Sequence, residues 1–436
     1  MTETAPVRIA LWGYGQFGKR TAESMKRYWG GAFAVTKIYD QEKREQDPWW
    51  GIEVSDPGDI SGDYHAGAFE KVMVCINASD ARDLVKKSLD GIGIPWFFPG
   101  NKEDIVPAAQ LEQYEEDQLS VREEGYSLFC LKNMRGAKSD HDVWGLIHLF
   151  DEEGRIPEES VRRFLSWEPD RTLMIPFRLK HAIPERVKLE GAYCALADLY
   201  TGNYWHFTFQ CADRVAMLED AGYQGKYIIA GTGSNLALMH LLGVGDDRII
   251  KAADLENHKV YEFEKLVLLS FARNNNGYSP EALARVVKKV KKQLVQREDA
   301  PKKLYVKRVG MRKLIRGDEI AEKLGFEIFV PEEHSVKEQM EAFYNADIVL
   351  TPHGANSTNC IYMREGSVFA EVFSSAWENI INRRMCETLG IHYLSETGEP
   401  VPQSRNQYGV VADYTVSEEK LNSLVKNAEE LLCLKK

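Results

Sequence analysis

A turn near the C-terminus combines small and polar residues in the way that an anion-binding site needs. It follows the apolar segment 347–350 and leads into a helix predicted at Ser357–Met363. Free N–H groups and the macrodipole at a helix N-terminus attract anions. Gly354 allows close backbone approach, whereas helix capping by Ser357 beside a buried His353 is the equal alternative. The turn reads Thr351-Pro352-His353-Gly354-Ala355-Asn356-Ser357-Thr358-Asn359.

Two arginines are candidates to bind the same anion. Between Arg285 and Arg316 there are 13 Lys or Arg and two acids, although the net charge of the chain is −11. Arg308 lies at the end of a predicted strand, Leu304–Val309, where parallel α/β sheets place their ligands. Its planar guanidinium donates two hydrogen bonds at once, which suits a diphosphate. Arg312 has the same interpretation, and a surface salt bridge is the alternative for both.

Four lysines of this basic segment lie on a predicted helix, Ser279–Gln296. They spread around the helix, so a solvated face is favoured over a patch for anionic lipid headgroups. Peripheral contact with a membrane is therefore the second interpretation. The four are Lys288, Lys289, Lys291 and Lys292.

A second glycine-rich turn lies near the N-terminus, between a predicted strand at Val7–Trp12 and a predicted helix at Lys19–Trp29. A GxGxxG motif in this context accommodates a pyrophosphate, and an acid at the end of the next strand binds a ribose hydroxyl. NAD(P) or another nucleotide is one interpretation. A structural turn is favoured, because nothing downstream resembles a dehydrogenase substrate domain. The residues concerned are Gly13, Gly15, Gly18 and Asp40.

Alternating strands and helices must position both turns, and they predict parallel α/β sheets. We expect an N-terminal Rossmann-like domain over 1–140, a second α/β domain over 141–298 and a third over 299–436. The charged segment 100–150 reads as helix and connection, and a single helix is expected around Trp205–Ala221. At 436 residues, more than one domain is the natural expectation.

Bulk composition excludes several classes of function. Net charge −11 argues against a nucleic-acid partner, because duplex binding needs a dominant basic surface. Seven cysteines, an odd number with no CxxC pair, favour a reducing compartment over a disulfide framework or a structural zinc site. No signal peptide or stretch long enough to span a bilayer is recognisable. We expect a cytoplasmic protein, with peripheral contact at the inner membrane face and a homo-oligomer both left open.

The segment 352–373 resembles the signature of glycosyltransferase family 61. The shared residues are His353-Gly354-Ala355, Thr358-Asn359, Gly366-Ser367 and Glu371. Upstream, LYVKRVGMRK resembles the tyrosine–strand–arginine segment of the family and places Arg308 and Arg312 in its basic positions. Asn203-Tyr204-Trp205-His206-Phe207 resembles its NY-aromatic-HW motif, and Arg214 falls where a later arginine does. The resemblance covers residues 145–436 approximately, including GRIPEES at 154–160.

This resemblance implies a GT-B-like pair of Rossmann-like domains, here preceded by the extra N-terminal domain. It implies inverting transfer without an obligate metal or other cofactor, from a nucleotide-sugar to a glycan or lipid-linked saccharide. The DxD-like triplet 140–142 is then a surface loop, with no metal ligand expected. The resemblance assigns donor binding to Arg308, Arg312, His353, Gly354, Ala355, Ser357, Thr358, Asn359 and Glu371.

Inversion needs a base that takes the proton of the acceptor hydroxyl. Many members of the family carry an acid four residues after the histidine of the NY motif, where this chain has Gln210. His206, Gln210 and Asp213 would share one helical face. His206 or Asp213 is therefore the candidate base, and His353 is the third candidate catalytic residue.

Three functions follow for the whole protein. The first is a transferase that builds a surface polysaccharide, such as a capsule or a lipopolysaccharide chain. The second is an NAD(P)-dependent oxidoreductase that uses the N-terminal turn. The third is a non-catalytic relative that binds nucleotide-sugars or glycans, with Gln210 marking a lost base.

Overall fold

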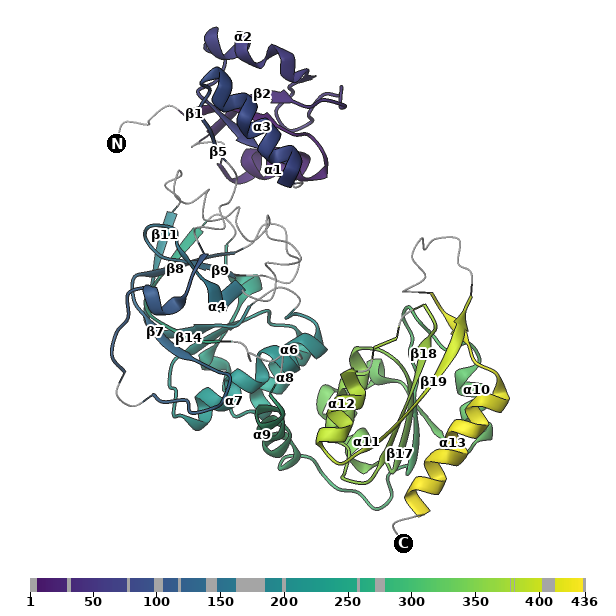
Figure 1. Ribbon diagram of the computed structural model, residues 1–436. Coiled ribbons are helices and arrows are strands. Elements are labelled where there is room, and N and C mark those ends of the chain that lie inside the picture. The colour runs from purple at the N-terminus through teal and green to yellow at the C-terminus, as the bar shows by residue number, and fades with distance from the viewer. Residues whose placement is uncertain are drawn as a thin grey trace.

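Three sheets of five or more strands organise the chain, as the computed structural model shows (Figure 1). None of the helices in the described part of the chain is long and apolar enough to cross a membrane. The structure describes residues 6–29, 33–76, 79–97, 105–116, 119–138, 147–161, 185–197, 201–256, 259–270, 279–376, 378–379, 381–401 and 412–433.

The first sheet is parallel and has the strand order β3-β2-β1-β4-β5. Four consecutive residues of the central strand β1, Ile9–Trp12, are buried, as expected of a strand covered on both faces. Its strands are β1 Val7–Trp12, β2 Phe33–Tyr39, β3 Val54–Ser55, β4 Lys71–Val74 and β5 Trp96–Phe97. Its helices are α1 Gln16–Trp29, α2 Ile60–His65 and α3 Ser79–Ile92.

The second sheet is mixed, with the order β13-β12-β11-β14-β8-β9 and β7 also paired to β14. Strands β11 to β14 are parallel, whereas β7, β8 and β9 pair antiparallel. Its strands are β7 Leu128–Leu131, β8 Met134–Lys138, β9 Ile147–Phe150, β11 Glu185–Ala195, β12 Lys226–Ile229, β13 Ile249–Lys251 and β14 Lys259–Leu269. Its helices are α4 Glu158–Val161, α6 Tyr204–Gln210, α7 Ala212–Asp220, α8 Gly233–Leu241 and α9 Pro280–Lys291. A separate two-stranded pairing joins β6 Ile105–Val106 to β10 Ile156–Pro157.

The reading of residues 100–150 as helix and connection is wrong. Strands β7 and β8 lie before residue 140, yet they pair with β14 of the second sheet, so the boundary expected at 140/141 cuts through that sheet. These strands are short and lie among charged residues, which hides the alternation that identifies a strand. The helix expected around Trp205–Ala221 is also wrong as a single helix, because α6 ends at Gln210 and Cys211 has φ −121°.

The third sheet has the order β16-β15-β17-β18-β19-β20 and is parallel except for the last pair. Helices α10 and α13 cover one face, and α11 and α12 cover the other (Figure 1). Its strands are β15 Lys303–Val306, β16 Glu327–Phe329, β17 Ile348–Pro352, β18 Val368–Ser374, β19 His392–Pro400 and β20 Tyr414–Thr415. Its helices are α10 Gly317–Lys323, α11 Val336–Asn345, the 3-10 helix η7 Ala355–Tyr362, α12 Ile381–Thr388 and α13 Glu418–Cys433.

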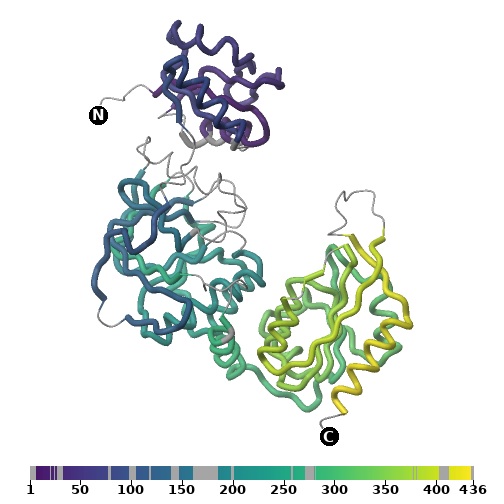
Figure 2. Tube along the Cα trace, viewed as in Figure 1, coloured from purple at the N-terminus to yellow at the C-terminus, as the bar shows by residue number. Residues whose placement is uncertain are grey.

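The second sheet with its helices forms one body, and the third sheet with its helices forms another. These second and third bodies share one hydrophobic core. It joins buried side chains of α7, α8 and α9 to those of α11 and η7, among them Phe343 and Ile361. The chain crosses between the bodies after α9, as the tube in Figure 2 shows. There Arg297 N donates to Asn345 Oδ1 (2.8 Å), and Val295 N donates to Glu341 Oε1 (3.2 Å). The two bodies are thus held together by packing and by buried polar contacts.

Candidate functional site

The turn after β17 lies at the carboxyl end of the third sheet, where parallel sheets bind ligands. The helix expected at Ser357 begins two residues earlier, at Ala355, and it is a 3-10 helix. The hydroxyl of Ser357 accepts a hydrogen bond from Gly354 N at 3.1 Å. Ser357 is fully buried and therefore closes the turn itself, in agreement with the capping alternative.

The imidazole ring of His353 is held by a hydrogen bond at its edge and by stacking on its face. Its Nδ1 lies 2.7 Å from Glu371 Oε1, and its ring stacks on Phe373 with centroids 5.0 Å apart. The backbone N of His353 donates to Val372 O at 2.9 Å. Only 12% of the His353 side chain is exposed. The ring therefore has one orientation, fixed by β18.

Glu371, expected to bind the donor, lies beneath the turn and contacts it through His353. It is fully buried on β18, and its carboxylate receives hydrogen bonds from three side chains. Asn382 Nδ2 lies 2.7 Å from Oε1, and the Tyr393 hydroxyl donates to Oε2 at 3.0 Å. These partners come from α12 and β19, two elements that sequence reasoning missed. Their positions in the sequence give no indication that they lie near His353.

Arg308 reaches the turn from the loop that follows β15. Its Nη1 donates to the carbonyl of His353 at 3.2 Å, and its Nε donates to the carbonyl of Met311. A Cβ on Gly354 would overlap Arg308 Nη1, so glycine is needed here for space. The φ of Gly354 is 178°, an extended conformation that any residue adopts. The guanidinium thus lies directly against the backbone of the turn.

The two arginines form a concentrated and partly desolvated positive charge. Burial lowers the pKa of Arg308, and burial together with the charge of Arg308 lowers the pKa of Arg312 to about 10. Within the described residues, no carboxylate lies within ion-pair distance of Arg308. Two guanidinium groups held together in this way are stabilised by an anion that contacts both.

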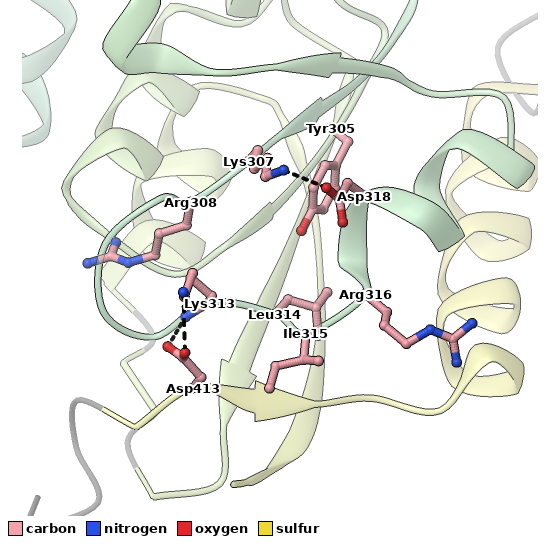
Figure 3. A pocket seen from close by; sticks show the side chains of 9 residues that line it. All are labelled: Tyr305, Lys307, Arg308, Lys313, Leu314, Ile315, Arg316, Asp318 and Asp413. Carbon is pink, nitrogen blue, oxygen red and sulfur yellow. Dashed lines mark hydrogen bonds and ion pairs between the residues drawn. The ribbon is translucent and has the colours of Figure 1, made fainter. Parts of the chain in front are cut away.

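A pocket of about 390 Å³ lies beside the same loop (Figure 3). Lys307 and Lys313, which line it, pair with Asp318 (2.5 Å) and Asp413 (3.7 Å). The guanidinium of Arg308 points away from these side chains (Figure 3). The charges of these two lysines are therefore neutralised, whereas Arg308, which also lines the pocket, has no ion pair among the described residues.

Thr358 and Asn359 were expected to bind the donor, but their side chains lie in the protein interior. Both are fully buried, and Asn359 Oδ1 accepts a hydrogen bond from the Tyr204 hydroxyl at 2.7 Å. This bond connects η7 to α6 across the two bodies. Ala355 is partly buried at the start of η7. The turn thus presents backbone, His353 and Arg308, while its last residues serve the interface.

His206 and Gln210 form a pair on α6. Asn203 caps this helix by accepting from Trp205 N (2.9 Å) and His206 N (3.5 Å). Gln210 Nε2 lies 2.7 Å from His206 Nδ1. Gln210 Oε1 is buried without a hydrogen-bond partner in the described part of the chain. Rotation of the amide would place this acceptor against Nδ1 instead, and the imidazole tautomer would change with it.

Asp213 does not share the helical face expected for it, because α7 is a separate helix. It is 4% exposed, and its carboxylate accepts from the Tyr126 hydroxyl and from Arg214 N. Burial raises the pKa of Asp213 against the opposing effects of these two partners. Arg214 is equally buried and donates to the carbonyls of Gln210 and Leu269. Asp213 belongs to this buried network.

The N-terminal turn has its own internal anion. Asp40 Oδ2 accepts from Tyr14 N (2.6 Å), and Oδ1 accepts from Glu42 N and Lys43 N. These backbone hydrogen bonds lower the pKa of Asp40 against its burial. A Cβ on Gly13 would lie 2.6 Å from Cys75 O, whereas a Cβ on Gly15 would meet no atom within 4 Å.

The lysines of α9 are mostly engaged in intramolecular contacts. Lys289 pairs with Asp220 at 2.6 Å, and Lys291 donates to the carbonyl of Met363 at 2.6 Å. Burial lowers the pKa of Lys291. Lys288 and Lys292 are exposed. Lys289 therefore pairs within the second body, because α7 and α9 both belong to it, and Lys291 contacts the third body through Met363.

Among the described residues, no three His, Cys, Asp or Glu side chains gather in a way that could hold a metal ion. The triplet 140–142 lies outside the described residues.

Residues 204–370 match the model of a protein family described as Glycosyltransferase 61. This match confirms the family expected from the sequence over a narrower range than 145–436. It contains His206, Arg308 and His353, and it ends one residue before Glu371. No curated protein matches the chain.

Three solved structures show a remote similarity. UDP-D-quinovosamine 4-dehydrogenase from Vibrio fischeri is 18% identical over 23% of this chain and 83% of its own, with a TM-score of 0.20. The Rex-family repressor RSP, in complex with β-NADH, is 19% identical over 22% of this chain, with a TM-score of 0.19. The match spans about half of that protein, 47%. A glycosyl transferase of family 9 from Veillonella parvula DSM 2008 is 11% identical over 100% of this chain and 99% of its own, with a TM-score of 0.18. At these TM-scores the family match alone carries the assignment.

Proposed function

We propose, since residues 204–370 are a glycosyltransferase 61 region, that the chain is an inverting transferase that moves a sugar from a nucleoside-diphosphate donor to a glycan acceptor. The donor diphosphate binds at the turn after β17, between Arg308, Arg312 and the backbone of Gly354. The second body carries the acceptor side in a GT-B-like arrangement. A surface polysaccharide is the product class that we favour.

One observation carries this proposal. Arg308, half-buried, contacts the glycine turn at the carboxyl end of a parallel sheet, and Arg312 lies close enough to it for the two charges to repel each other. Two partly desolvated guanidinium groups near each other are stabilised by an anion that contacts both. A diphosphate has the charge and the several acceptor oxygens that match two planar forks.

The leaving group determines what this site does in the reaction. As the bond between the sugar C1 and the phosphate oxygen breaks, negative charge grows on the diphosphate. Cations that are already positioned stabilise this charge with no reorganisation during the step. Arg308, Arg312 and the imidazole of His353 supply this stabilisation, and we propose that the step needs no divalent metal.

His206 is the base that we propose for the acceptor hydroxyl. With Gln210 Oε1 turned toward Nδ1, that nitrogen donates its hydrogen to the amide and Nε2 carries the lone pair that takes the proton. Gln210 thus does with a neutral oxygen what an acid does in other members of the family. Asp213 is assigned no catalytic role, because Tyr126 and Arg214 already engage it in the core.

A ligand panel in a thermal-shift experiment tests the proposal. UDP or GDP should raise the melting temperature with EDTA present, and UMP should raise it less. A ligand at 100 times its Kd adds about 2.7 kcal/mol of stability. Stabilisation by NAD alone would replace the transferase with the oxidoreductase, and a strict requirement for Mg²⁺ would remove the metal-free step.

Three variants test the base. His206→Ala should lower kcat by a factor of about 100 or more, the usual contribution of a general base. Gln210→Glu should keep the activity, whereas Gln210→Leu should lower it, because leucine cannot accept from Nδ1. Equal kcat in all three variants and the wild type would exclude His206 as the base. NMR of the product anomer tests inversion.

A further inference from the structure

The carboxylate of Glu371 is the centre of a buried cluster beneath the turn. It is 0% exposed, although a carboxylate is rarely fully buried unless it is paired. His353 Nδ1 and Asn382 Nδ2 each lie 2.7 Å from Oε1, and the Tyr393 hydroxyl lies 3.0 Å from Oε2. Three elements besides β18 therefore converge on one carboxylate.

The donors in this cluster leave Glu371 a single role, that of acceptor. An amide N–H only donates, and burial together with the Glu371 charge raises the pKa of Tyr393, so its hydroxyl stays protonated. An ionised carboxylate accepts only, so His353 must carry its hydrogen on Nδ1. Asn382 and Tyr393 hold the carboxylate in place, and the carboxylate in turn holds the imidazole.

Phe373 restricts the imidazole in the remaining direction. Its ring stacks on His353 with an interplanar angle of 26°, so the imidazole cannot turn about its own axis without losing this contact. The backbone of His353 is fixed as well, because its N donates to Val372 O and its O accepts from Arg308 Nη1. The edge of the ring that carries Nε2 therefore has a fixed direction. It belongs to the turn that the guanidinium of Arg308 contacts.

We propose that Glu371 is a positioning residue for the transfer reaction. It keeps the His353 hydrogen on Nδ1 and aims Nε2 at the departing diphosphate beside Arg308. As the diphosphate binds, Nε2 takes up a second hydrogen from solvent, and the doubly protonated imidazole donates from Nδ1 to Glu371 and from Nε2 to a phosphate oxygen. The inference rests on the proposed function for the identity of the ligand. The link between Glu371 and His353 stands on geometry alone.

Nitrogen-15 NMR of the ligand-free protein tests this link without any substrate. The chain has ten histidines, and His353 is assigned by its loss in His353→Asn. We expect a hydrogen on Nδ1 of His353 in the wild type, and a changed tautomer pattern in Glu371→Leu, because leucine has no oxygen that accepts from Nδ1. Tyr393→Phe is the matched control, because it removes a donor to the other oxygen of the same carboxylate. It should leave the His353 signal unchanged. A His353 protonated on Nε2 alone in the wild type would overturn the proposal even if Glu371→Leu does not fold.

A double-mutant cycle then separates positioning from general stability. Glu371→Gln should lower kcat/KM about tenfold, the size of one charge-assisted hydrogen bond, with kcat more affected than KM. In the His353→Asn background the same change should have almost no effect, since it acts through the imidazole. Equal losses in both backgrounds would overturn the proposal. If UDP and GDP fail to bind the wild type, the proposed function fails, and the NMR result still decides the link.

Discussion

Two strand–turn–helix segments of this chain look alike in sequence, yet the structure equips them differently. Both follow a buried parallel strand, β1 or β17, and both place a glycine where backbone N–H groups gather. At the N-terminal turn the Asp40 carboxylate accepts from one N–H of the turn, that of Tyr14, and from those of Glu42 and Lys43 in the loop after β2. In the C-terminal turn the N–H of Gly354 goes to a neutral hydroxyl, and the guanidinium of Arg308 approaches the backbone instead.

The difference teaches how to tell a binding turn from a structural one. A turn whose anion is supplied by its own chain is already satisfied and gains little from a ligand. A turn beside two half-buried arginines, where Arg308 has no ion pair among the described residues, gains more from an anion. Charge that the fold leaves without compensation therefore indicates a ligand more reliably than glycine spacing does.

The largest expected effect comes from removing a cation of the C-terminal turn. Arg308→Ala should weaken UDP binding about 100-fold, or about 2.7 kcal/mol, because a charge-assisted pair of hydrogen bonds is lost. Isothermal titration calorimetry measures this directly. Arg308→Lys is the matched control: it keeps the charge without the planar fork and should lose less. A Kd for UDP within twofold of the wild type in Arg308→Ala would erase the contrast between the two turns.

The sequence predicted much of the C-terminal turn, because its parts are local or follow from sheet topology. The start of helix α11, Val336–Asn345, follows from a local signal, since Ser335 and Glu338 form a capping box there. Arg308 and His353 were expected together because the carboxyl ends of neighbouring parallel strands meet at one edge. That expectation needed no information about distant contacts.

The missed parts depend on contacts between elements remote in sequence. Asn382 and Tyr393 reach Glu371 from α12, a helix of eight mostly polar residues, and from β19, whose sequence does not alternate between apolar and polar residues. The break at Cys211 separates Asp213 from His206, and no proline or glycine marks it. Asp40 was placed correctly at the end of β2, but its use by the loop itself follows only from the folded backbone.

The second prediction concerns the N-terminal turn, where glycine serves packing. Gly18→Ala should destabilise the first domain by about 2 kcal/mol, because the new Cβ would overlap the carbonyl oxygen of Gly13. UDP affinity should not change. The matched control is Gly15→Ala, which meets no atom within 4 Å and should be neutral in thermal unfolding. If Gly15→Ala weakened nucleotide binding, the N-terminal turn would be a ligand site after all.

The third prediction uses the glycine of the other turn. Gly354→Ala should weaken UDP binding about tenfold, because the Cβ displaces the Arg308 guanidinium rather than straining the backbone. Calorimetric titration measures the affinity, and circular dichroism should show an unchanged fold. In the Arg308→Ala background the same substitution should have little effect. An equal loss in both backgrounds would mean that the turn itself, and not the arginine, was disturbed.

The smallest effect is expected from replacing Arg312, which should stabilise the ligand-free fold and weaken ligand binding. Burial and Arg308 lower the pKa of Arg312 to about 10, below the value in an unfolded chain, so its charged form destabilises the ligand-free fold. This cost is fully present at neutral pH and is relieved as the pH rises through about 10. At pH 7, Arg312→Met should raise the melting temperature of the ligand-free protein by about 1 °C and reduce its stabilisation by UDP.

Scanning calorimetry with and without UDP measures both effects of the Arg312 substitution. Methionine is preferred to glycine here, because Arg312 has φ +64° and glycine would add a separate backbone gain. A lower melting temperature in the ligand-free variant would show that Arg312 stabilises the fold. Arg312 would then resemble Asp40, whose charge is already stabilised by hydrogen bonds within the protein.

A crystal structure of the protein with UDP, grown with EDTA, is the most direct test of which turn receives the diphosphate. We predict that its phosphate oxygens lie within hydrogen-bond distance of Arg308, Arg312 and His353 Nε2, with the N-terminal turn closed by Asp40. A diphosphate bound over Gly15, or one that contacts neither arginine, would contradict the account.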